Sequence, residues 1–173
     1  MSGRQAIWGA VAFLGLLLGP EPARAQNLEY QIKANYLVRF AAFVEWPASA
    51  FTSPAAPLTL CLAGRDPFGR VIDQAAAAQT AHGRRIVVRR LTERMDAAGC
   101  HIAYRGAGAD PIPSAPGLLV VSDSAVAPDR GAIHFVIVSN RVRFRIDQAA
   151  AQQARLNISS RLLNLAVDVR GSS

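Results

Sequence analysis

The sequence contains few of the residues that build metal sites and nucleophilic active sites. Its 173 residues include three histidines and two cysteines, and none of these falls in an HxH, HExxH or CxxC spacing. His101 follows Cys100 directly, but neighbouring side chains on a strand point to opposite faces, so the two would not pair as base and nucleophile. The sequence therefore predicts no catalytic residue, no metal site and no cofactor, and we do not expect an enzyme.

A serine nucleophile also lacks its usual surroundings. Ser122-Asp123-Ser124 follows a segment typical of a buried strand, but no G-x-S-x-G elbow surrounds it. We interpret these three residues as a solvated loop at the end of a strand.

No apolar run is long enough to span a bilayer. The longest, Ile7 to Leu18, has about a dozen residues, whereas a transmembrane helix needs roughly 20. It follows Arg4 and precedes Ala23-Arg24-Ala25, which is the order of a secretory signal peptide. We expect cleavage after Ala25, so that residues 1–25 are a signal peptide and residues 26–173 form the mature exported domain. An uncleaved membrane anchor is the alternative.

Lysine is almost absent, and arginine supplies nearly all of the positive charge. The formal net charge is +7, and Lys33 is the only lysine. The planar guanidinium group suits carboxylates and phosphates. Because an exported protein rarely meets nucleic acid, we expect no nucleic-acid partner. The composition favours an acidic protein partner or an anionic membrane surface.

Apolar periodicity predicts one domain that contains both helices and strands. Residues 28–46 have the spacing of an amphipathic helix, which Pro47 should end, whereas residues 142–146 alternate apolar side chains with arginine as on a half-solvated strand. Helices are predicted over 28–46, 67–79, 147–155 and 159–166, and strands over 58–62, 86–91, 100–104, 118–121, 132–139 and 142–146, with a turn at Asn140-Arg141. This order favours the α/β class, with a single-domain mixed β-sheet flanked by helices on both faces.

The two cysteines are candidates for a disulfide. An even number of cysteines in an exported chain usually means a bridge. Cys61 lies in the first predicted strand and Cys100 begins a later one, so neighbouring strands would bring the thiols together. Two separate buried thiols are the alternative.

One loop has the position of an anion site. It comprises Gly64, Arg65, Asp66, Phe68 and Gly69, and it lies between a predicted strand and a predicted helix. Backbone amides and the helix dipole favour an anion at such a place, but the loop lacks the GxGxxG and GxxxxGK patterns. The alternative is a capped turn, with Asp66 as the N-cap, Pro67 as the first helical residue and Phe68 in the core.

Six segments of the chain carry specific motifs. They are Ile32 to Leu37, Phe43 to Pro47, Gly64 to Gly69, Gly117 to Asp123, Asn140 to Ile146, and Leu156 to Leu163. In these residues and in their order the chain resembles the YfiR-like family of periplasmic proteins. The segments extend over most of the mature chain.

The resemblance implies a fold, a location and a role. It implies a compact α/β sandwich in the periplasm, acting as a repressor that binds the periplasmic sensor domain of a membrane diguanylate cyclase and keeps cyclic di-GMP synthesis low. Cys61 and Cys100 match the family's cysteine pair between the first strand and a later one, whereas a second pair nearer the C-terminus has no counterpart here. We therefore expect a periplasmic binding regulator whose partner is a membrane-bound diguanylate cyclase or sensor kinase.

The sequence candidates for a partner surface lie near the C-terminus. Leu162, Leu163 and Leu165 lie beside Arg161 on the last predicted helix, and apolar residues with arginine are common interface anchors. Packing of these leucines in the core is the alternative. The sequence also leaves open a homodimer and a second function, a periplasmic small-molecule sensing or carrier module with an arginine-lined cleft.

Cleavage of the leader is directly testable. Expression of the whole chain should give an exported protein that begins at Gln26, because the small-x-small signal ends at Ala25. N-terminal sequencing and the intact mass measure this. A membrane-bound product that retains residues 7–18 would instead show an anchor.

Overall fold

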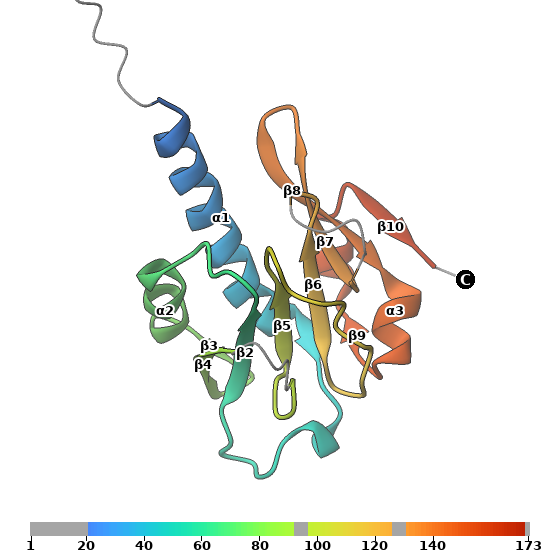
Figure 1. Cartoon of the computed structure of the whole chain (residues 1–173). Coiled ribbons are helices and arrows are strands. Elements are labelled where there is room, and N and C mark those ends of the chain that lie inside the picture. The colour runs from blue at the N-terminus through green and yellow to red at the C-terminus, as the bar shows by residue number, and fades with distance from the viewer. Residues whose placement is uncertain (1–20, 92–96, 126–130, 172–173) are drawn as a thin grey trace, which may run out of the picture.

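A computed structural model of the chain describes residues 21–91, 97–125 and 131–171. Within these ranges an eight-stranded sheet has the order β10-β8-β7-β6-β5-β2-β4-β3, and a two-stranded sheet pairs β1 with β9 (Figure 1). The strands are β1 (Val44–Glu45), β2 (Leu58–Ala63), β3 (Thr80–Ala81), β4 (Arg84–Arg90), β5 (Ile102–Arg105), β6 (Leu119–Asp123), β7 (Ile133–Val138), β8 (Arg141–Asp147), β9 (Asn157–Ile158) and β10 (Asp168–Arg170). The helices are α1 (Glu21–Phe43), α2 (Arg70–Ala77), α3 (Gln148–Gln153) and α4 (Ser160–Leu163), and a 3-10 turn spans Ala48–Ala50.

Neighbouring strands in the middle of the large sheet run in the same direction. β4, β2, β5, β6 and β7 pair in parallel, β8 returns antiparallel to β7, and β10 is parallel to β8. Strands covered on both faces read as near-continuous apolar runs, as β2 does in Leu58–Ala63. The mixed sheet and its helices confirm the predicted single-domain α/β fold.

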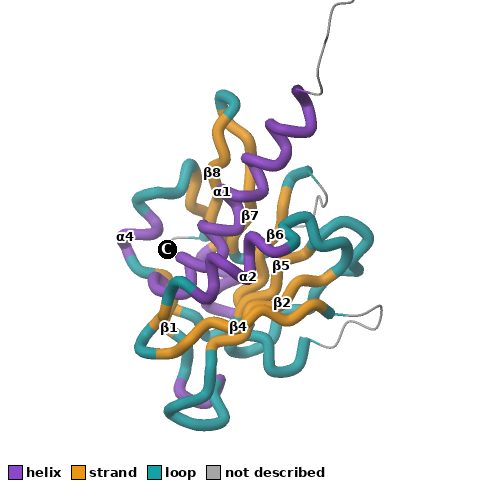
Figure 2. The backbone as a smooth tube through the Cα atoms, turned by 90° about the vertical axis from the view of Figure 1, so that its left-hand side faces the viewer, coloured by secondary structure: helices purple, strands orange, loops and turns teal. Residues whose placement is uncertain are grey.

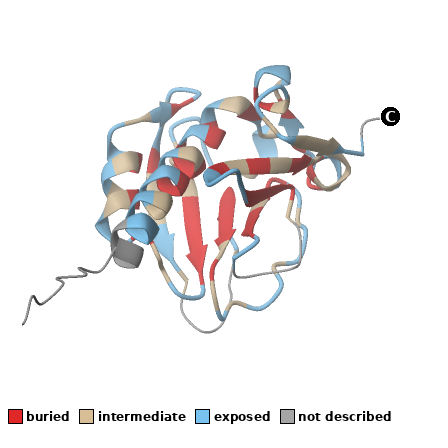
Figure 3. Cartoon of the chain, turned by 90° about the horizontal axis from the view of Figure 1, so that it is seen from above, coloured by how far each residue is buried: buried red, intermediate tan, exposed pale blue. Residues whose placement is uncertain are grey.

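The long helix α1 covers one face of this sheet. It lies behind the strands in Figure 1, and Figure 2 shows α1 and α2 on the same side. Phe40 of α1 is fully buried and packs against Phe135 of β7 and Phe144 of β8, with ring centroids 5.7 and 5.1 Å apart. Most of the apolar core lies between α1 and the sheet. Figure 3 shows buried residues in red on both the helices and the strands.

The opposite face carries a smaller core around the disulfide. Cys61 in β2 is bonded to Cys100, which precedes β5, with the two Cα atoms 5.8 Å apart, and Leu118 belongs to the same buried cluster. The segment 106–118 runs over this cluster, and α3 lies beside it, where Ala150 lines a small cavity with Leu118 and Val120. The predicted bridge is therefore present and ties β2 to the segment that leads into β5.

Several helix boundaries differ from the sequence prediction, and two of these differences have a local cause. The first helix ends at Phe43 instead of Trp46, because Val44 and Glu45 pair with β9 as a short strand. The second begins at Arg70 instead of Pro67, because the chain first closes a turn around the side chain of Asp66. In both places a local pairing replaces the helical hydrogen bonds that the pattern predicts.

The β7–β8 hairpin turns one residue earlier than predicted. Ser139 and Asn140 occupy the turn with φ of 48° and 58°, the left-handed values of a two-residue hairpin turn, and Arg141 already pairs with Val138. The pairing of β6 with β7 ends at Phe135. The tip of the hairpin therefore projects beyond its neighbouring strand (Figure 1).

The predicted signal peptide lies mostly outside the described residues. Of residues 1–25, only 21–25 are described, and they form the first turn of α1. In the part of the chain that the structure covers, no helix is both long and apolar enough to cross a membrane. Cleavage after Ala25 stays a prediction and would leave a helix that begins at Gln26.

Loss of the disulfide should destabilise this fold. The bridge joins residues 39 positions apart, and the chain-entropy model gives roughly 4 kcal/mol for a closed loop of about this length. We expect the double variant Cys61→Ala/Cys100→Ala to lose about that free energy of unfolding, because its unfolded state regains the loop freedom. Urea titrations followed by circular dichroism measure the loss, and an unchanged midpoint would contradict the prediction.

Candidate functional site

A groove between α1 and the β7–β8 hairpin gathers exposed apolar side chains from distant parts of the chain. Leu28 and Ile32 of α1 and Ile137 of β7 line it, with exposed fractions of 58%, 38% and 46%. The groove encloses about 500 Å³. Exposed apolar side chains that gather in one place and have a polar rim mark interaction sites. This groove is our candidate partner-binding surface.

Both walls of the groove follow from regular secondary structure. On α1, Leu28, Ile32 and Tyr36 are spaced four residues apart and so lie on one side of the helix. On the hairpin, Ile137 and Val142 lie directly opposite each other in the antiparallel register. Tyr36 packs on the aromatic core at the floor. Figures 1 and 2 show the start of α1 and the hairpin tip projecting at the same end of the sheet.

Two arginines flank the hairpin side of the groove, at positions of β8 that alternate with the inward-facing Val142. Arg141 and Arg143 contribute to its lining, and neither makes an ion pair with any residue that the structure describes. Glu29 on the α1 side is a carboxylate, but it already pairs with Lys33. The rim is therefore positive and complementary to an acidic partner.

A buried charge network beside the groove holds the N-terminal half of α1 on the sheet. Lys33 has no exposed surface, and its Nζ lies 2.6 Å from Oδ2 of Asp123 at the end of β6. Glu29 pairs with the same ammonium group. Tyr104 of β5 donates a hydrogen bond of 3.1 Å to Asp123. One ammonium thus joins a carboxylate of the helix to a carboxylate of the sheet.

Aromatic rings close this network against water. The Nζ of Lys33 lies 5.0 Å from the ring centroid of Tyr30, and Phe68 packs edge-to-face on Tyr30 and Tyr104, with centroids 5.8 and 4.8 Å apart. In such surroundings, removing one partner of an ion pair leaves a charge without compensation and costs about 3–5 kcal/mol. The network therefore sets the position of α1, and with it the position of one wall of the groove.

Burial also shifts the titration of the tyrosines in the network. The pKa of Tyr104 lies well above its usual value near 10.0, chiefly because burial disfavours the phenolate, and the negative charge of Asp123 adds to the shift. Burial likewise raises the pKa of Tyr30, although the neighbouring Lys33 opposes this. Tyr104 accordingly keeps its proton and remains a hydrogen-bond donor to Asp123.

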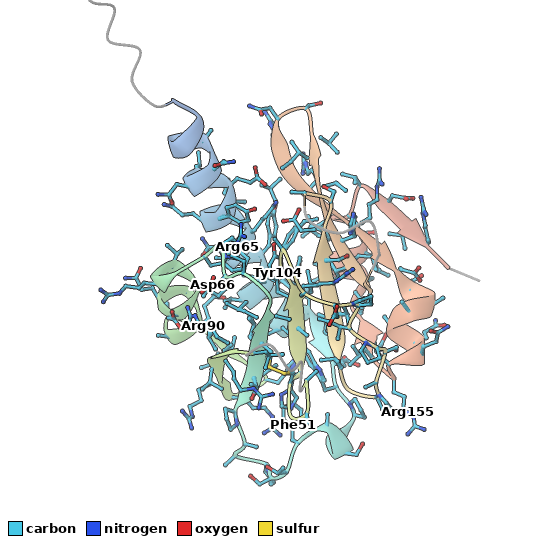
Figure 4. The ribbon with its side chains drawn as sticks, in the orientation of Figure 1. Phe51, Arg65, Asp66, Arg90, Tyr104 and Arg155 are labelled. Atoms are coloured by element: carbon cyan, nitrogen blue, oxygen red, sulfur yellow. A yellow bond between two sulfur atoms is a disulfide. The ribbon has the colours of Figure 1, made fainter. Side chains whose placement is uncertain are left out.

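The hydrogen-bonding groups of the predicted ligand loop find their partners within the chain. It comprises Gly64, Arg65, Asp66, Phe68 and Gly69, and it lies at the carboxyl end of β2, near Tyr104 (Figure 4). Asp66 accepts hydrogen bonds from the amides of Phe68 and Gly69 at 2.7 and 3.1 Å, and Arg90 donates to its other oxygen at 2.8 Å. An anion would have to displace this carboxylate, so a turn that Asp66 closes accounts for the loop, with Gly69 and not Asp66 as the N-cap of α2. Ligand binding there stays a prediction. Across the described ranges, no three His, Cys, Asp or Glu residues are placed to hold a metal ion.

The predicted C-terminal partner surface is only partly exposed. Leu162 is 2% exposed and belongs to the core, so its place on that surface is wrong. The reason is that α4 packs against α1, and its short turn directs Leu162 inward. Leu163 is half-buried, whereas Arg161 and Leu165 are exposed. Core packing, the alternative interpretation, holds for Leu162.

The buried network was not among the features that the sequence pattern predicted. Ser122 and Asp123, interpreted as part of a solvated loop, are 1% and 0% exposed, and the hydroxyl of Ser122 lies 2.7 Å from Nδ1 of His134. One signal was available. Lys33, the single lysine of an arginine-rich chain, lies within the predicted amphipathic helix. If that side chain is buried, its charge requires a partner of opposite charge. The same pattern assigns Leu28 to the buried face of the helix, although the structure exposes it.

One protein family matches most of the chain. The sequence pattern of one family, described as YfiR/HmsC-like, matches residues 30–167, which include the large sheet as far as its last edge strand. The chain belongs to the YfiR/HmsC-like family. This confirms the resemblance seen in the sequence motifs. The YfiR/HmsC-like family is regulatory and non-catalytic, and it acts through a membrane signalling partner. No individual curated protein matches the chain.

The ion pair of this YfiR/HmsC-like domain should be costly to break from one side. We expect Lys33→Met to lower the free energy of unfolding by about 3–5 kcal/mol, because Asp123 stays buried without its cation. The double variant Lys33→Met/Asp123→Leu should recover much of that loss, because no fully buried charge remains and the side chain of Glu29, 28% exposed, keeps contact with water. Urea titrations measure both, and a double variant less stable than the single one would contradict the role given to the pair.

The raised pKa of Tyr104 should make the stability of the fold depend on pH. Its pKa is raised in the folded state, so above pH ~10 the unfolded chain loses a proton that the folded chain keeps, and stability falls as the pH rises. Tyr104→Phe should lose roughly 1.5 kcal/mol at pH 7, through the hydrogen bond to Asp123. The difference in the free energy of unfolding between wild type and Tyr104→Phe should then be smaller by roughly 1 kcal/mol at pH 11. Urea titrations at both pH values measure this difference. A difference that is the same at pH 7 and pH 11 would contradict the raised pKa of Tyr104.

Proposed function

We propose that the mature chain is a periplasmic binding regulator that docks on the periplasmic sensor domain of a membrane signalling protein. In this role it represses a membrane diguanylate cyclase and keeps cyclic di-GMP synthesis low. Membership of the YfiR/HmsC-like family supports the class of function. The bridge between Cys61 and Cys100 supports an oxidising compartment, such as the periplasm reached through a cleaved signal peptide.

The groove between α1 and the hairpin is the observation that carries this proposal. A binding regulator needs apolar side chains that a partner can bury and charged groups that orient the partner. The groove supplies both, in Leu28, Ile32 and Ile137 on its walls and in Arg141 and Arg143 on its rim. Burial of each of these half-exposed apolar side chains contributes about 1 kcal/mol to binding.

The groove is also held in shape before a partner arrives. The Lys33 network fixes α1, and the cross-strand pairs of the hairpin, such as Ile137 with Val142, fix the other wall. A preorganised surface loses little conformational entropy on binding. This favours a stable complex with a sensor domain over a transient contact.

A pair of matched variants tests which surface docks. Leu28 in the groove and Leu165 on the C-terminal surface are 58% and 56% exposed, so neither Leu28→Asp nor Leu165→Asp should disturb the core. The tagged mature chain is used to capture proteins from solubilised membranes of its own organism, and mass spectrometry identifies them. We expect wild type and Leu165→Asp to retain a membrane cyclase or kinase, and Leu28→Asp to retain roughly tenfold less, since each 1.4 kcal/mol is tenfold in affinity.

The opposite results are equally specific. Retention by Leu28→Asp together with loss by Leu165→Asp would move the docking site to the surface of Arg161 and Leu165. Capture of no membrane signalling protein by the wild-type chain would contradict the regulator proposal itself.

A pocket at the other end of the sheet supports a second candidate function, small-molecule sensing. Trp46, Phe51, His82 and Arg84 line a cavity of about 320 Å³, a size that suits small ligands. The guanidinium carbon of Arg84 lies 3.7 Å from the ring centroid of Phe51, so one wall is both aromatic and cationic. Figure 4 shows Phe51 far from Asp66, which separates this pocket from the predicted ligand loop.

Native mass spectrometry tests this second function. A small molecule that co-purifies with the wild-type chain and is lost in Phe51→Ala would support sensing through this pocket. A wild-type protein that carries no added mass when purified from its own periplasm would count against it.

A further inference from the structure

The groove has the form of a helix-binding site. Leu28, Ile32 and Tyr36 make a ridge along α1 with a spacing of four residues, and ridges of this kind pack into the grooves between the equivalent ridges of a second helix. The ridge runs for about 12 Å, a little over two helical turns. Ile137 and Val142 provide the facing wall at the same level. A helix laid between α1 and the hairpin would contact both walls.

The charges beside the groove specify the flanks of such a helix. Arg141 and Arg143 have no ion-pair partner among the described residues. The one carboxylate among the lining residues, Glu29, is held by the ammonium group of Lys33, which it shares with Asp123. Acidic side chains beside the apolar stripe of an incoming helix would pair with the two guanidinium groups, and basic side chains would be repelled.

The same charges disfavour a second copy of this chain as the occupant. Two copies that met groove to groove would bring Arg141 and Arg143 of each copy close together, and the whole chain already carries a net charge of +7. A bilayer surface also fits poorly, because the apolar side chains face each other across a groove between the two projecting elements. The half-buried Tyr36 at the floor is out of reach of a flat surface.

We propose that the groove binds an acidic amphipathic helix of the partner protein. Apolar side chains at positions i, i+4 and i+8 of that helix enter between α1 and the hairpin, and flanking Asp or Glu residues pair with Arg141 and Arg143. This inference rests on the proposed function and adds the partner's structural element and its charge. Recognition of this kind is a helix-in-groove contact.

Synthetic peptides test the chemistry of the groove without the partner. Two peptides of about 18 residues, long enough to form a helix, share one leucine stripe and carry either glutamate or lysine flanks. Fluorescence anisotropy with the mature chain should show the glutamate peptide binding at least about tenfold more tightly than the lysine peptide. Ile137→Asp and Arg141→Glu/Arg143→Glu should each weaken the glutamate peptide at least about tenfold. Arg85→Glu, an exposed arginine of β4, is the matched control and should change nothing.

Equal binding of the two peptides, or binding unaffected by Ile137→Asp, would overturn the proposal. Binding of phosphatidylglycerol vesicles that Ile137→Asp abolishes, with neither peptide bound, would overturn it in favour of a membrane surface. Dimerisation of the wild-type chain that Ile137→Asp abolishes, again with neither peptide bound, would overturn it in favour of a second copy.

Crosslinking separates a failure of this inference from a failure of the proposed function. A photo-crosslinking amino acid in place of Ile137 is introduced into the full mature chain, and the chain is mixed with solubilised membranes. Crosslinks to an acidic helical segment of a captured membrane protein support the proposal. Crosslinks to a basic or extended segment overturn the helix but leave the regulator function standing. Capture of no membrane protein counts against the regulator function, and the peptides then decide the chemistry of the groove alone.

Discussion

The position of α1 depends on one buried ammonium group. Lys33 extends from the helix to Asp123 at the end of β6, and Glu29 and Tyr104 complete the surroundings of the pair. The apolar contacts of the helix are non-directional and would tolerate small shifts along the sheet. A buried ion pair with its hydrogen bonds has a defined geometry. The helix that forms one wall of the groove is therefore held in a single register on the sheet.

The other wall exists because neighbouring strands differ in length. The pairing of β6 with β7 ends at Asp123, the residue that holds Lys33, whereas β7 and β8 continue to the turn at Ser139 and Asn140. Among the described residues the hairpin tip therefore has no neighbouring strand, and Ile137 remains exposed beside α1. The same carboxylate that fixes the helix thus lies where the supporting strand stops. A partner that filled the groove would cover the apolar surface that this difference in strand length exposes.

Local pattern was sufficient for the fold and insufficient for the surface. Strands such as Leu58–Ala63 read directly from their apolar runs, and the pairing of Cys61 with Cys100 agreed with their places on neighbouring strands. The groove could not be read in this way, because Ile137 has the same β-prone character as its buried neighbours, and its exposure depends on where β6 ends. The burial of Leu162 likewise depends on how α4 packs on α1, which the local sequence pattern does not specify.

The cellular concentration of cyclic di-GMP tests whether the groove docks the regulator on its membrane partner. The gene is deleted from its own organism and restored as wild type, as Ile137→Asp or as Arg85→Glu, with equal amounts of each protein in the periplasm. If the groove docks the regulator, cyclic di-GMP rises on deletion, returns to its original level with wild type and with Arg85→Glu, and stays high with Ile137→Asp. Full restoration by Ile137→Asp, or a level that deletion does not change, would contradict this docking.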